Sequence, residues 1–229
     1  MLQKLQRTIS AERIGRYILA AKGDLDCAIR IYAINIQVSQ TLYGVLHGYE
    51  IALRNAMHDN LKAHYGCEDW YAQASLSRAH FDMVQDAQAS AARSITDGSK
   101  VPVGKVIAEL RLGFWTGLVA PAYEQSLWPC LRRAFPNTTP SRQKTYWLLR
   151  DIWRIRNRIA HHERILGSNG RLYVGLHPIH RREMTLPPEA ILECVEWICP
   201  ATSEWIRTTA QFENCTRLLE SIKGARFDS

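Results

Sequence analysis

The sequence predicts an all-α protein, and three observations carry that prediction. Apolar residues recur at helical spacing along most of the chain, strand-like alternation is almost absent, and proline and glycine fall mainly between the periodic segments. The 229 residues are enough to bury a sizeable core, and they contain no internal repeat. We therefore expect residues 1–229 to form a single helical domain, with residues 168–229 as a candidate C-terminal helical extension.

Proline, glycine and capping residues divide most of the chain into helices of ordinary length. Ser10 and Gly23 frame the first of them as an N-cap and a C-terminal glycine would. Pro102 suits the first turn of another, and Pro200 separates the last two. The predicted helices of this kind cover residues 11–22, 77–96, 102–118, 121–135, 141–166, 188–199 and 202–222. Residues 168–187 are expected to form a loop that could pair as a brief hairpin.

One predicted helix is far longer than the rest. From residue 24 to residue 65 the helical pattern continues without proline, so one very long helix or two nearly collinear helices are expected. A break, if there is one, is expected within residues 39–48. Gly44 and Gly48 lie four residues apart on one helix face, where they would either let another helix approach closely or mark a kink.

Composition places the chain among soluble cytoplasmic proteins. No stretch has the apolar length of a membrane helix, and the first nine residues lack the apolar core of a secretory signal. The six cysteines are scattered and include no CxxC pair, so we expect reduced thiols, no zinc site and no disulfide framework. The net charge of +7 favours contact with polyanions, although many basic proteins bind none.

The densest polar cluster lies in the predicted helix 141–166. Its apolar residues Ile152, Ile155 and Ile159 would face the core, whereas Arg154, Arg158 and His161 fall on about one opposite face. Several arginines of this helix lie beside aromatic residues, a combination that suits phosphates and stacked bases. A solvated helix face beside an aromatic core would have the same composition.

Arginine and histidine suit the cleavage of RNA without a metal ion. One group must remove the 2′-hydroxyl proton, another must protonate the leaving oxygen, and a cation must stabilise the charge on the phosphate. Histidine titrates near neutral pH and can do either proton transfer, while arginine stays charged and offers two donors to phosphate oxygens. Both residue types occur together in the polar cluster of the predicted helix 141–166.

The segment Arg156-Asn157-Arg158-Ile159-Ala160-His161 resembles the Arg-x(4–6)-His signature of HEPN ribonucleases. Three further stretches resemble the Abi-like branch of that superfamily, known for abortive-infection proteins. They are Glu50-Ile51-Ala52-Leu53-Arg54-Asn55, then Tyr65-Gly66 followed by Trp70-Tyr71, and Val106-Ile107-Ala108-Glu109-Leu110-Arg111-Leu112-Gly113-Phe114-Trp115. The resemblance covers residues 25–166, and the rest of the chain resembles no family.

This resemblance implies a HEPN-like helical bundle that dimerises and cuts RNA in a cleft between two Arg/His motifs, without metal or cofactor, leaving cyclic phosphate ends. His161 would be the general acid or base and Arg156 the phosphate stabiliser. The supporting residues would be Asn157, His162, Glu50, Arg54 and Asn55, and the RNA-binding residues Arg150, Arg154 and Arg158. The expected role is that of a toxin in phage defence or in a toxin–antitoxin pair, with an antitoxin or a regulatory RNA as a further partner.

Helix geometry bears on the catalytic pair. Five residues turn an ideal helix by about 140°, so Arg156 and His161 converge only if the helix unwinds near His161 or if two protomers supply them. His161, His162 and Glu163 point too far apart to share one metal ion.

Alternatives to the implied roles are open. Glu50 and Arg54 could form an ordinary ion pair across one helical turn, worth about 0.3–0.5 kcal/mol. Phe114 and Trp115 are expected to pack in the core. For the whole protein, the alternative is a non-catalytic module that grips RNA or a protein, whereas nucleotide-transferase chemistry is disfavoured because no glycine-rich phosphate loop is present.

Overall fold

The computed structural model describes residues 2–96, 99–166 and 187–222 and confirms the all-α class. In these ranges the α-helices are α1 (Leu2–Ile9), α2 (Ala11–Ala20), α3 (Leu25–Tyr65), α4 (Arg78–Arg93), α5 (Val103–Glu109), α6 (Leu112–Gly117), α7 (Trp128–Leu131), α8 (Arg142–Ala160), α9 (Pro187–Ile198), α10 (Pro200–Arg207) and α11 (Ala210–Ile222). Three 3₁₀ turns join them, η1 (Trp70–Ala72), η2 (Pro121–Tyr123) and η3 (Arg132–Ala134). None of the described helices is long and apolar enough to cross a membrane.

The chain divides into two compact units, each made of separate segments. The first unit comprises Met1–His47, Arg154–Ile191 and Trp205–Ser229, and the second comprises Gly48–Trp153 and Leu192–Glu204. Helices α3 and α8 belong partly to each unit because the division falls within them. The two units are described separately below.

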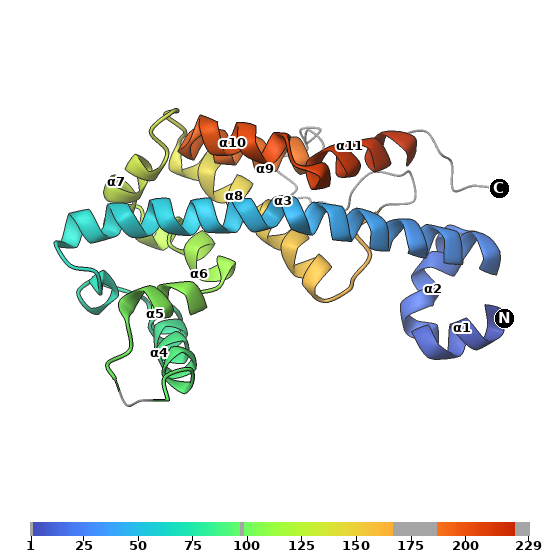
Figure 1. The fold of residues 1–229 in the computed structure, drawn as a ribbon, viewed down its shortest axis with the longest axis horizontal. Helices are drawn as coiled ribbons and strands as arrows, with labels where there is room; N and C mark the ends of the chain where they lie inside the picture. The colour runs from blue at the N-terminus through green and yellow to red at the C-terminus, as the bar shows by residue number, and fades with distance from the viewer. Residues whose placement is uncertain (1, 97–98, 167–186, 223–229) are drawn as a thin grey trace. The chain divides into compact units, whose positions relative to one another are not determined.

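Helix α3 is continuous over its 41 residues, as its blue-to-cyan ribbon shows (Figure 1). The break expected within residues 39–48 is therefore absent, because Gly44 serves close packing instead of a kink. A Cβ atom added at Gly44 would lie 2.6 Å from Cγ of Gln211 on α11. The close approach of a second helix, one of the two predicted readings of this glycine, is confirmed.

The first unit has its core between α2, the beginning of α3, the end of α8 and α11. Ser10 caps α2 by accepting a hydrogen bond from the Arg13 amide at 3.3 Å, and Gly23 ends the following turn at a φ of 96°. The cap and the terminal glycine are where the sequence predicted them. The large buried side chains of this core are Ile14, Tyr17, Ile31, Val38, Leu42, Ile155, Ile159, Phe212 and Leu219.

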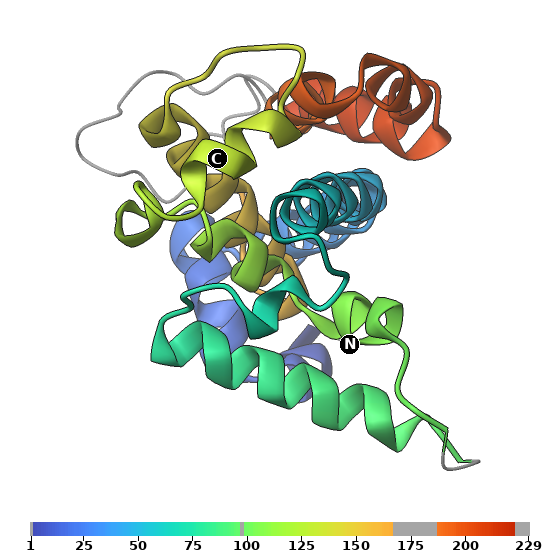
Figure 2. The same cartoon turned by 90° about the vertical axis from the view of Figure 1, so that its left-hand side faces the viewer.

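The second unit is built around aromatic side chains, and α4 packs against both α5 and α6 in it. Figure 2 shows α4 lying next to α5. Phe114 and Trp115 are 1% exposed, so their predicted place in the core is confirmed. The predicted continuous helix 102–118 is wrong, because the backbone is extended at Leu110 and Arg111. There the buried Trp115 indole donates to the Leu110 carbonyl at 3.2 Å.

Three other boundaries differ from the prediction. The expected helix 121–135 consists of η2, α7 and η3, which are three short pieces. The expected helix 202–222 is two helices, because Thr208 and Thr209 lie between α10 and α11. The predicted helix 141–166 ends at Ala160, for reasons given below. Most of the predicted loop 168–187 lies outside the described residues.

Candidate active site

The C-terminal end of α8 is closed by the two hydrogen bonds of a Schellman turn. The Glu163 amide donates to the Arg158 carbonyl at 2.7 Å, and the His162 amide donates to the Ile159 carbonyl at 3.0 Å. His162 has a φ of 55°, the left-handed conformation that glycine usually supplies at this position. The chain therefore leaves the helix directly after His161.

A left-handed histidine costs free energy, about 1–2 kcal/mol relative to the right-handed conformation, so other contacts must hold it in place. One of them comes from α2, where the Arg13 guanidinium donates to the His162 carbonyl at 2.7 Å. Arg13 is exposed and His162 is exposed. This surface contact therefore ties the first residue beyond the helix end to α2.

A second contact comes from α3 and is buried. Asn35, only 3% exposed, accepts the Ile165 amide at 2.8 Å and the Leu166 amide at 3.4 Å through Oδ1. Its Nδ2 donates to the Glu163 carbonyl at 3.5 Å. One buried side-chain amide thus pairs with three backbone groups, and its bonds to the Ile165 and Leu166 amides are buried. The segment after the motif is fixed to α3 as a consequence.

Two arginines complete the surroundings of this turn. Arg158 donates to the Arg164 carbonyl at 2.9 Å and lies 3.8 Å from the Glu163 carboxylate. Arg164 donates to the Arg16 carbonyl at 3.0 Å, and its guanidinium lies over the Tyr17 ring, 5.4 Å from the centroid. Burial raises the pKa of Tyr17 to about 12, while the nearby charge of Arg164 acts in the opposite direction.

Arg156 and His161 leave α8 in different directions. The His161 amide donates to the Asn157 carbonyl at 2.9 Å, which is the regular α-helical bond, so the helical path includes the backbone of His161. Five helical steps place the two side chains about 140° apart. Arg156 is half-buried, next to the core-facing side of Ile152, and His161 is exposed. The unwinding begins at His162, one residue too late to turn His161 towards Arg156.

Arg154 and Arg158 precede His161 by seven and three residues and share its helix face, as predicted. Both are half-buried, as is Asn157, which lies four residues before His161. Because Arg158 already donates to a backbone carbonyl, it has a structural task at the helix end.

Arg150 belongs to the second unit, where it lies among aromatic rings. Its guanidinium is 5.1 Å from the centroid of the Trp147 ring and 5.8 Å from that of Tyr146, and it donates to the Tyr146 hydroxyl at 3.4 Å. The predicted association of arginine with aromatic residues is therefore present at this position.

The Glu50 to Asn55 element also lies in the second unit. Arg54 donates to the Ala108 carbonyl at 3.2 Å and thereby links α3 to α5. Two of the stretches on which the family resemblance rests are thus in contact. Glu50 is half-buried and Asn55 is exposed. The role of these residues in orienting the motif stays a prediction.

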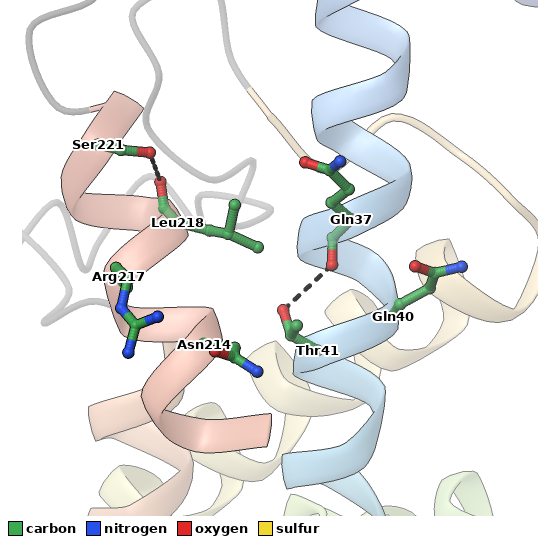
Figure 3. A pocket seen from close by; sticks show the side chains of 7 residues that line it. All are labelled: Gln37, Gln40, Thr41, Asn214, Arg217, Leu218 and Ser221. Carbon is green, nitrogen blue, oxygen red and sulfur yellow. Dashed lines mark hydrogen bonds between the residues drawn. The ribbon is translucent and has the colours of Figure 1, made fainter. Parts of the chain in front are cut away.

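A shallow groove of about 430 Å³ lies between α3 and α11 in the first unit (Figure 3). Its walls carry Gln37, Gln40, Thr41, Asn214, Arg217, Leu218 and Ser221. Thr41 and Ser221 donate to backbone carbonyls of their own helices, and Arg217 is paired with Glu213 at 2.7 Å. No residue of the motif lines this groove, so we do not assign it to the reaction.

Within the described part of the chain, His, Cys, Asp and Glu form no cluster of three or more that could hold a metal ion.

Sequence reasoning missed Asn35 and Arg13. A signal for Asn35 was present, because it occupies a core position in the series Ile31, Asn35, Val38 and Leu42, where an unpaired amide would be costly. Nothing distinguished Arg13 from other surface arginines.

Comparison with protein-family models, with characterised proteins and with solved structures finds no match to this chain.

Proposed function

We propose that the protein is a metal-independent endoribonuclease of the HEPN type, related to the Abi-like branch. The observation that carries the proposal is the end of α8, where an exposed histidine is held at a fixed helix end, on the helix face that also carries Arg154 and Arg158. This arrangement supplies a proton-transfer group and cations that can bind phosphate. The net charge of +7 favours a polyanionic substrate.

In the proposed reaction the 2′-oxygen of a ribose attacks the adjacent phosphorus and the 5′-oxygen of the next nucleotide leaves. His161 takes the 2′-hydroxyl proton or gives a proton to the leaving 5′-oxygen, and water makes the other of these two transfers. Arg156 binds the phosphate oxygens as negative charge accumulates on them. The products are a 2′,3′-cyclic phosphate and a 5′-hydroxyl. Asn157 would hold the 2′-hydroxyl or the local backbone, and Arg154 would bind the flanking RNA.

The angle between Arg156 and His161 supports a site shared by two copies of the chain. In one chain these side chains diverge by about 140°, and the turn at the end of the helix does not bring them together. A symmetric pair of α8 helices would let Arg156 of one protomer approach His161 of the other. We therefore propose a homodimer as the active form, acting as a toxin in phage defence or with an antitoxin.

Cleavage of end-labelled total RNA by purified protein in excess EDTA tests the proposal. The natural chain is compared with His161→Ala and Arg156→Ala, and His47→Ala serves as control because His47 is an exposed histidine of α3 in the same unit. Cutting that survives the chelator, yields cyclic phosphate ends and is lost only in the first two variants supports the proposal. Cutting of equal strength in all four proteins would show that the active site lies elsewhere.

A non-catalytic RNA-binding module is the second candidate, and the half-buried arginines of α8 favour it to the same degree as they favour catalysis. A folded natural chain that binds RNA and cuts none would establish this reading. Under it, His161→Ala leaves the RNA affinity unchanged.

A further inference from the structure

Two side chains outside α8 hold the chain at the point where the proposed catalytic histidine ends the helix. Arg13 of α2 donates a hydrogen bond to the carbonyl of His162, and Asn35 of α3 forms hydrogen bonds with the backbone of residues 163, 165 and 166. All of these residues belong to the first unit. These hydrogen bonds go to backbone atoms of the turn, so they act on its position and not on its chemistry.

We infer that Arg13 and Asn35 form a clamp that fixes the backbone at His161 and so positions its imidazole for proton transfer. The inference rests on the proposed function for its catalytic consequence. Both are positioning residues, because their hydrogen bonds are to backbone atoms and not to the imidazole of His161.

The conformation of His162 explains why a clamp is needed. A β-carbon disfavours the left-handed conformation, and the free energy that it costs would be relieved if the turn relaxed or if α8 continued by another residue. Either change would rotate His161 relative to the substrate. Bonds to the carbonyl of His162 and to the amides of Ile165 and Leu166 oppose both changes, because each bond is lost if the turn rearranges.

Arg164 and Arg16 form a second hydrogen bond between α2 and the segment that follows the turn. Arg164, which follows the turn, donates to the Arg16 carbonyl on α2, one helical turn beyond Arg13. The contact between α2 and the turn thus includes two reciprocal arginine-to-carbonyl bonds, one in each direction. The guanidinium of Arg16 makes neither of them, since only its carbonyl takes part.

This difference between Arg13 and Arg16 gives a matched pair of variants. Both arginines are exposed on α2, so replacing either by alanine removes one positive charge from the same surface without opening a cavity. Arg13→Ala breaks the bond to the turn, and Arg16→Ala leaves it intact. Arg13→Lys keeps a donor that can reach the carbonyl and should restore the contact in part.

Asn35 has its own variants and control. Asn35→Ala removes all three bonds to the turn, whereas Asn35→Asp keeps the acceptor that serves Ile165 and Leu166. Asn60→Ala is the control, because Asn60 is a half-buried asparagine of the same helix that donates at 2.8 Å to the Ala56 carbonyl within the helix.

The first measurement is amide hydrogen exchange, which does not depend on any RNA. Exchange at Ile165 and Leu166 should accelerate by about tenfold or more in Asn35→Ala, because an opened hydrogen bond exposes the amide to water. It should accelerate less in Asn35→Asp, which keeps the acceptor but buries a charge and loses the donor to Glu163, and Asn60→Ala should exchange like the natural chain. Unchanged exchange in Asn35→Ala would overturn the clamp whether or not the protein cuts RNA.

The second measurement is RNA cleavage at saturating and at low substrate. Arg13→Ala should lower kcat by about tenfold with little change in KM, because a misplaced proton-transfer group costs rate and not binding. Arg13→Lys should recover part of the loss, and Arg16→Ala should cut like the natural chain. Equal loss in Arg13→Ala and Arg16→Ala would overturn the inference in favour of simple charge attraction. An active natural chain with an equally active Arg13→Ala would overturn it while the ribonuclease proposal stands, and no cutting by the natural chain would overturn both.

Discussion

The indole nitrogen of Trp70 donates to Nδ1 of His58 at 3.0 Å, a bond that exists only while that ring nitrogen is unprotonated. Trp70 is fully buried in the second unit, and burial lowers the pKa of His58 below its ordinary value of 6.5. His80, which lies against Phe114 and Tyr123 in the same unit, has its pKa lowered by burial as well.

These two histidines predict that acid destabilises the second unit. The unfolded chain binds protons at about pH 6.5, and the folded chain binds them only at lower pH, so the free energy of unfolding falls as the pH falls through this window. Above pH 6.5 this contribution is fully present. Urea unfolding followed by tryptophan fluorescence between pH 7.5 and about pH 5 measures the effect.

His58→Asn should flatten part of this pH dependence, because the amide oxygen can accept the indole bond and does not titrate. His64→Ala is its control, as His64 is an exposed histidine of the same helix. A pH dependence that is the same in both variants and in the natural chain would contradict the assignment to His58.

A pair of glycine substitutions tests the contact between α3 and α11. Gly44→Ala should destabilise the protein by about 1–3 kcal/mol, because the added methyl group would overlap Cβ and Cγ of Gln211. Gly15→Ala in α2 should be neutral or stabilise by up to about 1 kcal/mol, since a Cβ there meets nothing within 4 Å and alanine favours the helix. Urea unfolding of the two variants compares them directly, and equal stabilities would refute close packing at Gly44.

The two arginines beside His161 should differ in what they contribute. Arg158→Ala should lower the free energy of unfolding by about 1.5–3 kcal/mol, because it deprives the Arg164 carbonyl of a charged donor and removes the Glu163 pair. Arg154→Ala should reduce the salt dependence of RNA binding by about one ion. Binding titrations at several salt concentrations, together with thermal unfolding, separate the two effects. If Arg158→Ala changed the salt dependence of RNA binding and left the free energy of unfolding unchanged, the roles assigned to the two arginines would be wrong.

A site shared between protomers predicts that two inactive variants restore each other. In a mixed dimer of Arg156→Ala and His161→Ala, one of the two sites keeps an intact arginine and an intact histidine. An equimolar mixture that exchanges subunits should recover about one quarter of the natural activity, since half of the dimers are mixed and each has one good site. Cleavage assays on the mixture measure this. If each site lies within one chain, the mixture stays inactive although both variants are folded.

The sequence was a good guide wherever local pattern decides the structure. Ser10 and Gly23 frame α2 as predicted, and the core face of α8 holds Ile152, Ile155 and Ile159. These features follow from helical periodicity and from capping chemistry, which involve neighbouring residues only.

Boundaries set by distant contacts could not be read in the same way. Neither proline nor glycine marks the break at Leu110 and Arg111, where the buried indole of Trp115 takes up the free carbonyl. The end of α8 at Ala160 depends on a histidine in a conformation that tertiary bonds maintain. The candidate site was therefore found from the sequence as a motif, while the residues that hold it in place were not.

The bond between Asn35 and the Ile165 amide joins positions 130 residues apart in the chain. A ribosome adding about 5–20 residues per second needs roughly ten seconds to pass from the first to the second, and until then the helix end has no partner on α3. For an enzyme proposed to cut RNA, this order of events would delay activity until most of the chain has left the ribosome, which itself contains RNA.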